Sequence, residues 1–246
     1  ARLVYLGVAH SLADDSKSRL VIDIGGGSTE FIIGQKFEPV ALESLQIGCL
    51  SFAEKYFPKG KITGKAFQNA YEAAALEVSH ISGNFLATGW RECVGSSGTL
   101  QSIETVAVTN GWTETGINLE TLQRFKEHIL LFNNFDEVTI DGLNESRRNV
   151  IVTGVAITLA IFSSMNITSM RISKGALREG VVYDLLGRLS HEDVRERTIN
   201  ALMLRYGVDQ PGARSVAERV QSFFASVRET WNLSSHDQDI LYWASL

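Results

Sequence analysis

The sequence predicts an α/β domain followed by the beginning of an all-α segment. Three short apolar stretches separated by short turns lie between residues 20 and 47, a pattern typical of an antiparallel meander. Longer stretches with apolar residues at helical spacing follow, and they alternate with two further short strands. From His191 onward every segment looks helical and is more charged. We therefore expect one domain at 1–189 and the start of a second at 190–246.

Each expected element has a local reason. Strands are predicted where short apolar runs end at glycine or polar residues, and helices where apolar residues recur every three or four positions. The expected strands are 20–24, 29–33, 40–47, 91–94 and 170–173. The expected helices are 1–10, 67–85, a helix from about 99, 119–132, 145–165 and 176–186. Apolar residues lie on all sides of 145–165, which predicts a buried helix.

Composition excludes several classes of protein. The net charge of −5 lacks the basic character of a nucleic-acid binder, so we expect no nucleic-acid partner. No apolar run reaches the length of a membrane span. Cys49 and Cys93 are far apart and form no CxxC motif, which argues against a zinc site or a disulfide scaffold. Their spacing favours a reducing compartment, and we expect a cytoplasmic protein.

The most informative stretch runs from Asp23 to Glu30 and contains three consecutive glycines. If Gly26 and Gly27 form a two-residue hairpin loop, which requires positive φ at both positions, Asp23 lies opposite Glu30. Alternation along the strands then places Asp23, Ser28 and Glu30 on one face of the sheet. The other face carries the apolar side chains of the two strands, so the acids lie opposite a core face.

This hairpin predicts a metal and phosphate site. Directly opposed carboxylates repel each other unless a cation neutralises them, and Mg²⁺ prefers carboxylate, water and phosphate oxygens. The turn formed by Gly25, Gly26 and Gly27 has no side chains, so phosphate oxygens can approach its backbone N–H groups closely. The alternative is a plain tight turn flanked by exposed sheet charges.

Two later glycine-containing segments are further candidates. Gly95, Ser97, Gly98 and Thr99 follow a strand and open a helix, where free N–H groups favour an anion; the pattern also fits a plain strand-to-helix turn. In the segment 175–180, Arg178 could clamp a phosphate oxygen or pair with a carboxylate.

These motifs together resemble those of the exopolyphosphatase/guanosine pentaphosphate phosphohydrolase (Ppx/GppA) family. The matching segments are LVIDIGGGSTE at 20–30, GCLSFAEKYFP at 48–58, GSSGT at 95–99 and GALREG at 175–180. The resemblance covers essentially the whole chain. It implies an actin-like (ribonuclease H-like, ASKHA) fold and a C-terminal helical part that resembles HD phosphohydrolases.

The resemblance also implies roles. Asp23 and Glu30 match acids that hold the divalent metal, Gly26 and Ser28 match phosphate-loop positions, and Gly98 lies in the second loop. The implied reaction is the attack of water on a terminal phosphate, with Mg²⁺ as cofactor and K⁺ as a candidate second cation. A homodimer is the implied assembly. Arg171, Lys174, Arg178 and Arg188 are candidates to line a substrate channel, although a solvated basic face is the favoured explanation for them.

The chain departs from the family pattern in two ways. The family's first half, with its own phosphate loop, has no counterpart here, and the general-base glutamate of the family is expected just before Ala1. We therefore expect these 246 residues alone to be inactive or nearly so.

Two substrates within the family and two other classes of protein remain open. Gly27 and the Phe37–Pro39 segment favour inorganic polyphosphate over guanosine pentaphosphate. An actin-like ATPase or a non-catalytic sensor of phosphate compounds is the alternative outside this family. Neither an adenosine pocket nor a sugar-binding segment is recognisable in the sequence.

Overall fold

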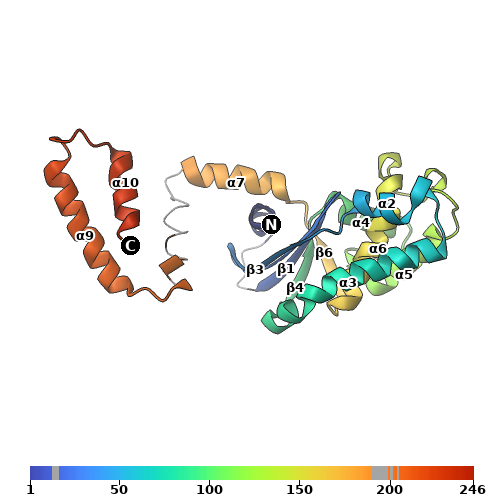
Figure 1. The fold of residues 1–246 in the computed structure, drawn as a ribbon. Helices are drawn as coiled ribbons and strands as arrows, with labels where there is room; N and C mark the ends of the chain where they lie inside the picture. The colour runs from blue at the N-terminus through green and yellow to red at the C-terminus, as the bar shows by residue number, and fades with distance from the viewer. Residues whose placement is uncertain (13–16, 190–198, 200–201, 204) are drawn as a thin grey trace. The chain divides into compact units, whose positions relative to one another are not determined.

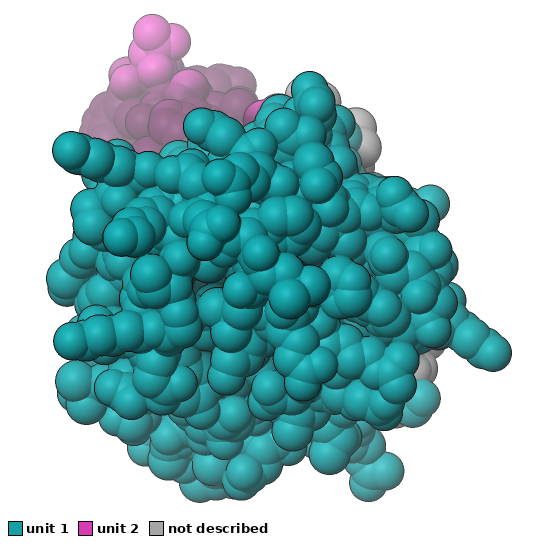
Figure 2. Space-filling view, turned by 90° about the vertical axis from the view of Figure 1, so that its right-hand side faces the viewer, with its two compact units in different colours: residues 1–183 teal, residues 184–246 magenta. Residues whose placement is uncertain are grey.

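A computed structural model describes residues 1–12, 17–189, 199, 202–203 and 205–246. These residues divide into two compact units, 1–183 and 184–246, which Figure 2 shows in separate colours. The helix α7 (Leu177–Leu189) spans the division between them. Among the described residues, no helix is both long enough and apolar enough to cross a bilayer.

Unit 1 is built on one mixed sheet with the strand order β3-β2-β1-β4-β6-β5 (Figure 1). The strands β1, β2 and β3 are antiparallel, β4 and β6 continue parallel to β1, and β5 pairs antiparallel with β6. The strands are β1 (Ser18–Ile24), β2 (Thr29–Gln35), β3 (Glu38–Leu45), β4 (Glu92–Gly95), β5 (Ile117–Asn118) and β6 (Ser169–Ile172). The expected antiparallel meander is thus confirmed.

Helices cover both faces of this sheet. In unit 1 they are α1 (Arg2–Ser11), α2 (Cys49–Tyr56), α3 (Gly64–Thr88), α4 (Gly98–Thr109), α5 (Leu119–Ile129), α6 (Arg148–Ser164) and the first part of α7, with short 3-10 turns at Pro58–Gly60, Phe135–Glu137 and Glu145–Arg147. Unit 2 contains α9 (Gln210–Val227) and α10 (Ser235–Ala244). The sequence did not predict α2, because its eight residues show too little periodicity.

The two faces of the sheet carry different cores. Alternate residues of β1 and β2, such as Ile22 and Phe31, pack against α3 and α6 in the larger core. The opposite residues, Val21 and Ile32, pack against α1. The helix α6 is buried continuously from Val150 to Phe162, as its all-round apolar sequence predicts.

The helix α1 therefore covers the face of the sheet that carries Asp23 and Glu30. Tyr5 is buried there, and its hydroxyl donates a hydrogen bond to the carbonyl of Lys36 over 3.0 Å. The helix α1 contacts the sheet through Val21 and Ile32, which pair with each other farther from the glycine turn than Asp23 and Glu30 do. The two acids therefore lie at the end of this face, next to the turn.

The glycines of the 175–180 segment bring α7 close to α1. A Cβ at Gly180 would overlap with the carbonyl oxygen of Leu3, and one at Gly7 would overlap with that of Ala176. At the end of α1, Ser11 Oγ lies 2.7 Å from Ser173 Oγ, which tightens the same contact. This segment therefore has a packing role that its sequence did not reveal.

We expect Gly180→Ala to lower the free energy of unfolding by about 1–3 kcal/mol, because the backbones of α1 and α7 must separate to admit a methyl group. Urea unfolding of the chain measures this. Gly83→Ala in α3 is the matched control: its Cβ would meet no atom within 4 Å. Better helix propensity should make that variant more stable by about 0.5–1 kcal/mol. Equal effects of the two substitutions would contradict the close packing of α1 and α7.

Candidate functional site

The β1–β2 hairpin places the two acids as its alternation predicts. Asp23 lies directly opposite Glu30 in the register, and the N–H of Gly25 donates to the carbonyl of Ser28 over 2.8 Å. The prediction of positive φ at Gly26 and Gly27 is wrong, however, because neither glycine has φ in the left-handed region. The reason lies outside the hairpin, in the helix α2.

The N-terminus of α2 holds the glycine turn. The N–H of Cys49 donates to the carbonyl of Gly25 over 2.9 Å, and the N–H of Leu50 donates to that of Gly26 over 2.8 Å. No side chain caps α2, so the turn's carbonyls satisfy the amides at its first turn. A Cβ at Gly48 would overlap with the backbone of Gly26 and Gly27, so this contact requires glycine there.

This arrangement leaves the turn's own N–H groups available. Within the described part of the chain, no backbone acceptor pairs with the N–H groups of Gly26, Gly27 or Ser28. Gly26 and Gly27 are also exposed. The turn can therefore present several donors to one anion.

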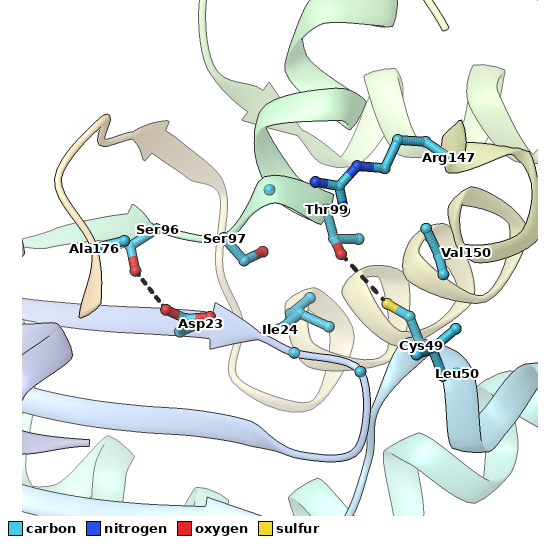
Figure 3. A pocket seen from close by; sticks show the side chains of 13 residues that line it. Asp23, Ile24, Cys49, Leu50, Ser96, Ser97, Thr99, Arg147, Val150 and Ala176 are labelled. Carbon is cyan, nitrogen blue, oxygen red and sulfur yellow. Dashed lines mark hydrogen bonds between the residues drawn. The ribbon is translucent and has the colours of Figure 1, made fainter. Parts of the chain in front are cut away.

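The second loop lies beside the first. The strand β4 ends at Gly95, and α4 begins at Gly98 with Ser97 as its N-cap, whose side chain accepts from the N–H of Leu100 over 3.1 Å. Ser96 Oγ donates to Asp23 Oδ2 over 3.0 Å and so joins the two loops (Figure 3). The N-terminus of α4 adds the positive end of a helix dipole to the same place.

The loops enclose a pocket of about 340 Å³. Its walls combine turn backbone, hydroxyls, one carboxylate and one guanidinium (Figure 3). The lining residues are Asp23, Ile24, Gly25, Gly26, Cys49, Leu50, Ser96, Ser97, Gly98, Thr99, Arg147, Val150 and Ala176.

Six of the predicted site residues line this pocket: Asp23, Gly25, Gly26, Ser97, Gly98 and Thr99. The other five lie outside the lining. Gly27 is at the exposed tip of the turn, and Gly95 is packed against Leu100 and Met170. Ser28 Oγ donates to Glu30 Oε1 over 2.7 Å, next to Asp23 rather than in the pocket wall. Arg178 is exposed on α7.

Arg147 is the main residue that the sequence analysis missed. It precedes α6, and its side chain extends toward Thr99 in Figure 3. A Cβ at Gly98 would lie 2.7 Å from one terminal nitrogen of this guanidinium. Nothing in the local sequence pairs residue 147 with residue 98. Ser96, in contrast, stands within the GSSGT motif and could have been chosen from it.

The electrostatics of the site disfavour the ionised form of Asp23. Burial raises the pKa of this carboxyl above its ordinary value of 3.8; the hydrogen bond from Ser96 lowers it, and the charge of Glu30 raises it further. The neighbouring Cys49 is almost fully buried, and burial also raises the pKa of its thiol. Cys49 therefore contributes a neutral thiol to the pocket wall at pH 7.

Asp23 and Glu30, paired on adjacent strands, are the side chains that could hold a divalent cation here. Among the described residues, no group of three or more His, Cys, Asp and Glu side chains could hold a metal. Mg²⁺ needs no such cage, because it is commonly bound through one or two carboxylates, waters and substrate phosphates. The raised pKa of Asp23 indicates that a nearby positive charge would be favourable.

The mixed sheet and its helices form a domain of the actin-like fold, with the pocket beside the glycine turn. The chain belongs to the Ppx/GppA phosphatase family, whose model matches residues 1–189. The crystal structure of the Aquifex aeolicus member of this family is similar, with a TM-score of 0.66 and 23% identity, over 77% of this chain and 62% of that one. An exopolyphosphatase from Cytophaga hutchinsonii gives a TM-score of 0.64 and 20% identity, over 75% of this chain and 62% of that one.

Two curated relatives are more similar in sequence. A guanosine-5'-triphosphate,3'-diphosphate pyrophosphatase of Photobacterium profundum is 38% identical over 242 residues, which is 98% of this chain and 48% of the relative. The enzyme of the same name from Pseudoalteromonas translucida is 39% identical over 235 residues, 96% of this chain and 47% of the relative. The chain thus spans about half the length of these relatives.

We expect Asp23→Asn to stabilise the metal-free protein at pH 7. A carboxyl whose pKa is raised on folding binds more protons in the folded state than in the unfolded state. Its ionisation therefore lowers the free energy of unfolding as pH rises above 3.8. The substitution removes this loss, so it should raise the midpoint of urea unfolding at pH 7 and leave it nearly unchanged at pH 3.

Glu30→Gln is the companion variant, because it removes the repulsion of Asp23 and keeps a side-chain oxygen that can accept from Ser28. It should raise the midpoint of urea unfolding at pH 7 by less than Asp23→Asn does. The double variant should raise this midpoint by less than the sum of the two single effects. Destabilisation by Asp23→Asn at pH 7 would contradict the unfavourable charge at this position.

Proposed function

We propose that the protein containing this chain removes the terminal phosphate of guanosine pentaphosphate by hydrolysis. The observation that carries the proposal is the pocket that two glycine-containing loops line together with Asp23 and Arg147. The names of the two curated relatives support guanosine pentaphosphate as the substrate.

The proposed roles follow from the chemistry of each group. The N–H groups of Gly26 and of the first turn of α4 would bind phosphate oxygens, and the dipole of α4 favours the same charge. Arg147 would neutralise an oxygen on the side of Gly98, where its guanidinium lies. Catalysis of this reaction depends on such positioning and charge stabilisation.

Asp23 and Glu30 would hold the Mg²⁺ ion that we propose as cofactor. When bound, Mg²⁺ would neutralise charge on the phosphate and on these two carboxylates. Ser96 and Ser28 donate to one carboxylate each, which fixes the oxygens left for the metal. A K⁺ ion stays a candidate second cation, and the homodimer and the cytoplasmic location stay predictions.

Inorganic polyphosphate is the second candidate substrate. No aromatic side chain is among the described residues that line the pocket, so this part of the site offers no ring for stacking on guanine. Its donors recognise phosphate, which both substrates carry. Gly27 and the Phe37–Pro39 segment favour polyphosphate in the sequence, whereas both curated relatives are named for the nucleotide.

The test is orthophosphate release by the full-length protein with Mg²⁺, measured side by side on guanosine pentaphosphate and long polyphosphate. Faster release from the nucleotide is expected. Asp23→Ala should lower kcat/KM by roughly 100-fold or more, because a metal ligand is lost. Release from neither substrate would contradict the proposal and leave ATP hydrolysis or phosphate sensing.

Arg147 and Arg148 form a matched pair for the same assay. Arg147→Ala should lower kcat/KM about 10-fold, because a charged partner of phosphate is removed. Arg148 instead pairs with Glu145 over 2.9 Å and lies outside the pocket lining, so Arg148→Ala should retain full activity. Equal effects of the two substitutions would exclude a direct role for Arg147.

A further inference from the structure

The beginning of α6 contacts both loops of the candidate site. Arg147 and Val150 line the pocket itself, and one turn later Thr153 and Gly154 lie behind it. Thr153 is completely buried. These positions follow one another at three- to four-residue spacing, so they share one side of the helix.

Thr153 reaches the segment that holds the glycine turn. Its Oγ1 donates to the carbonyl of Cys49 over 2.9 Å, across 104 positions in sequence, and shares this donation with the carbonyl of Val150 at 3.0 Å, one turn earlier in α6. The N–H of the same Cys49 donates to Gly25 over 2.9 Å. A single residue, Cys49, thus links the hydroxyl of Thr153 to the first phosphate loop.

Gly154 reaches the second loop. A Cβ at this position would overlap with Thr99 Cγ2, so a glycine is needed for α6 to lie so close to the N-terminus of α4. Thr99 Oγ1 in turn lies 3.5 Å from Cys49 Sγ (Figure 3). The N-termini of α2 and α4 therefore meet at one point on α6.

We propose that Thr153 is a positioning residue that, together with Gly154, fixes the separation of the two loops. The proposal deepens the proposed function and rests on it. The first loop joins β1 to β2, and the second joins β4 to α4 about 70 positions later, so a phosphate that binds both needs their spacing to be fixed within a fraction of an ångström. Thr153 does so through Cys49 without lining the pocket itself.

The matched control lies on the same helix. Thr158 is also completely buried, but its hydroxyl donates to the carbonyl of Gly154, one turn earlier in α6. Threonine to valine preserves the shape of either side chain and removes only the hydroxyl. Thr153→Val and Thr158→Val thus both lose a buried hydrogen bond, but only the first loses a link to the site.

Steady-state kinetics of the full-length protein test the positioning role. We expect Thr153→Val to lower kcat/KM for guanosine pentaphosphate about 10-fold, Thr158→Val to leave it within about 2-fold, and Thr153→Ser to restore it. Should Thr153→Val fail to fold, Thr153→Ala and Thr158→Ala give the same comparison.

Amide hydrogen exchange supplies a readout that needs no activity. Thr153→Val should speed exchange in the segments 23–30 and 48–51 relative to Thr158→Val, because the turn is held less firmly. Equal exchange and equal kcat/KM in the two variants would overturn the positioning role. A wild-type protein without phosphate release would instead defeat the proposed function, while the exchange comparison would still decide whether Thr153 holds the turn.

Discussion

The candidate site depends on the hydrogen bonds between the amides at the start of α2 and the carbonyls of the glycine turn. A helix begins with amides that need acceptors, and a tight turn leaves carbonyls that need donors. Here Cys49 and Leu50 supply the donors, and Gly25 and Gly26 supply the acceptors. Because the carbonyls face α2, the N–H groups of the turn are left for another partner. One contact therefore stabilises the fold and orients the site.

The same contact explains which parts of the site could be predicted. The pairing of Asp23 with Glu30 follows from the period of two along strands, and the structure has that register. The conformation of the turn does not follow from its own sequence, because α2 begins more than 20 positions later and decides which groups the turn must present. A glycine-rich turn in isolation favours positive φ, and the contact with α2 favours another conformation.

Long-range packing explains the remaining differences. Gly175 and Gly180 flank Arg178, a candidate phosphate clamp by sequence, and the fold shows that both glycines serve the approach of α1 and α7. Arg147 stands among polar residues before an apolar helix and gave no signal of its own. Thr153 and Thr158 look equivalent in an apolar run, and only the fold shows that one of them reaches another element. Alternation and helical periodicity predict which elements form and which faces are buried, but not which residues of separate elements meet.

The net charge of −5 shows why composition alone says little about an anion site. The pocket draws on backbone N–H groups, the dipole of α4 and the guanidinium of Arg147, none of which requires a basic domain. Asp23 beside Glu30 even adds negative charge at the place where phosphate would bind. A phosphate could not approach two ionised carboxylates closely unless a cation lay between them. The unfavourable charge of these acids in the metal-free site is therefore the physical reason for proposing that a cation binds there together with phosphate.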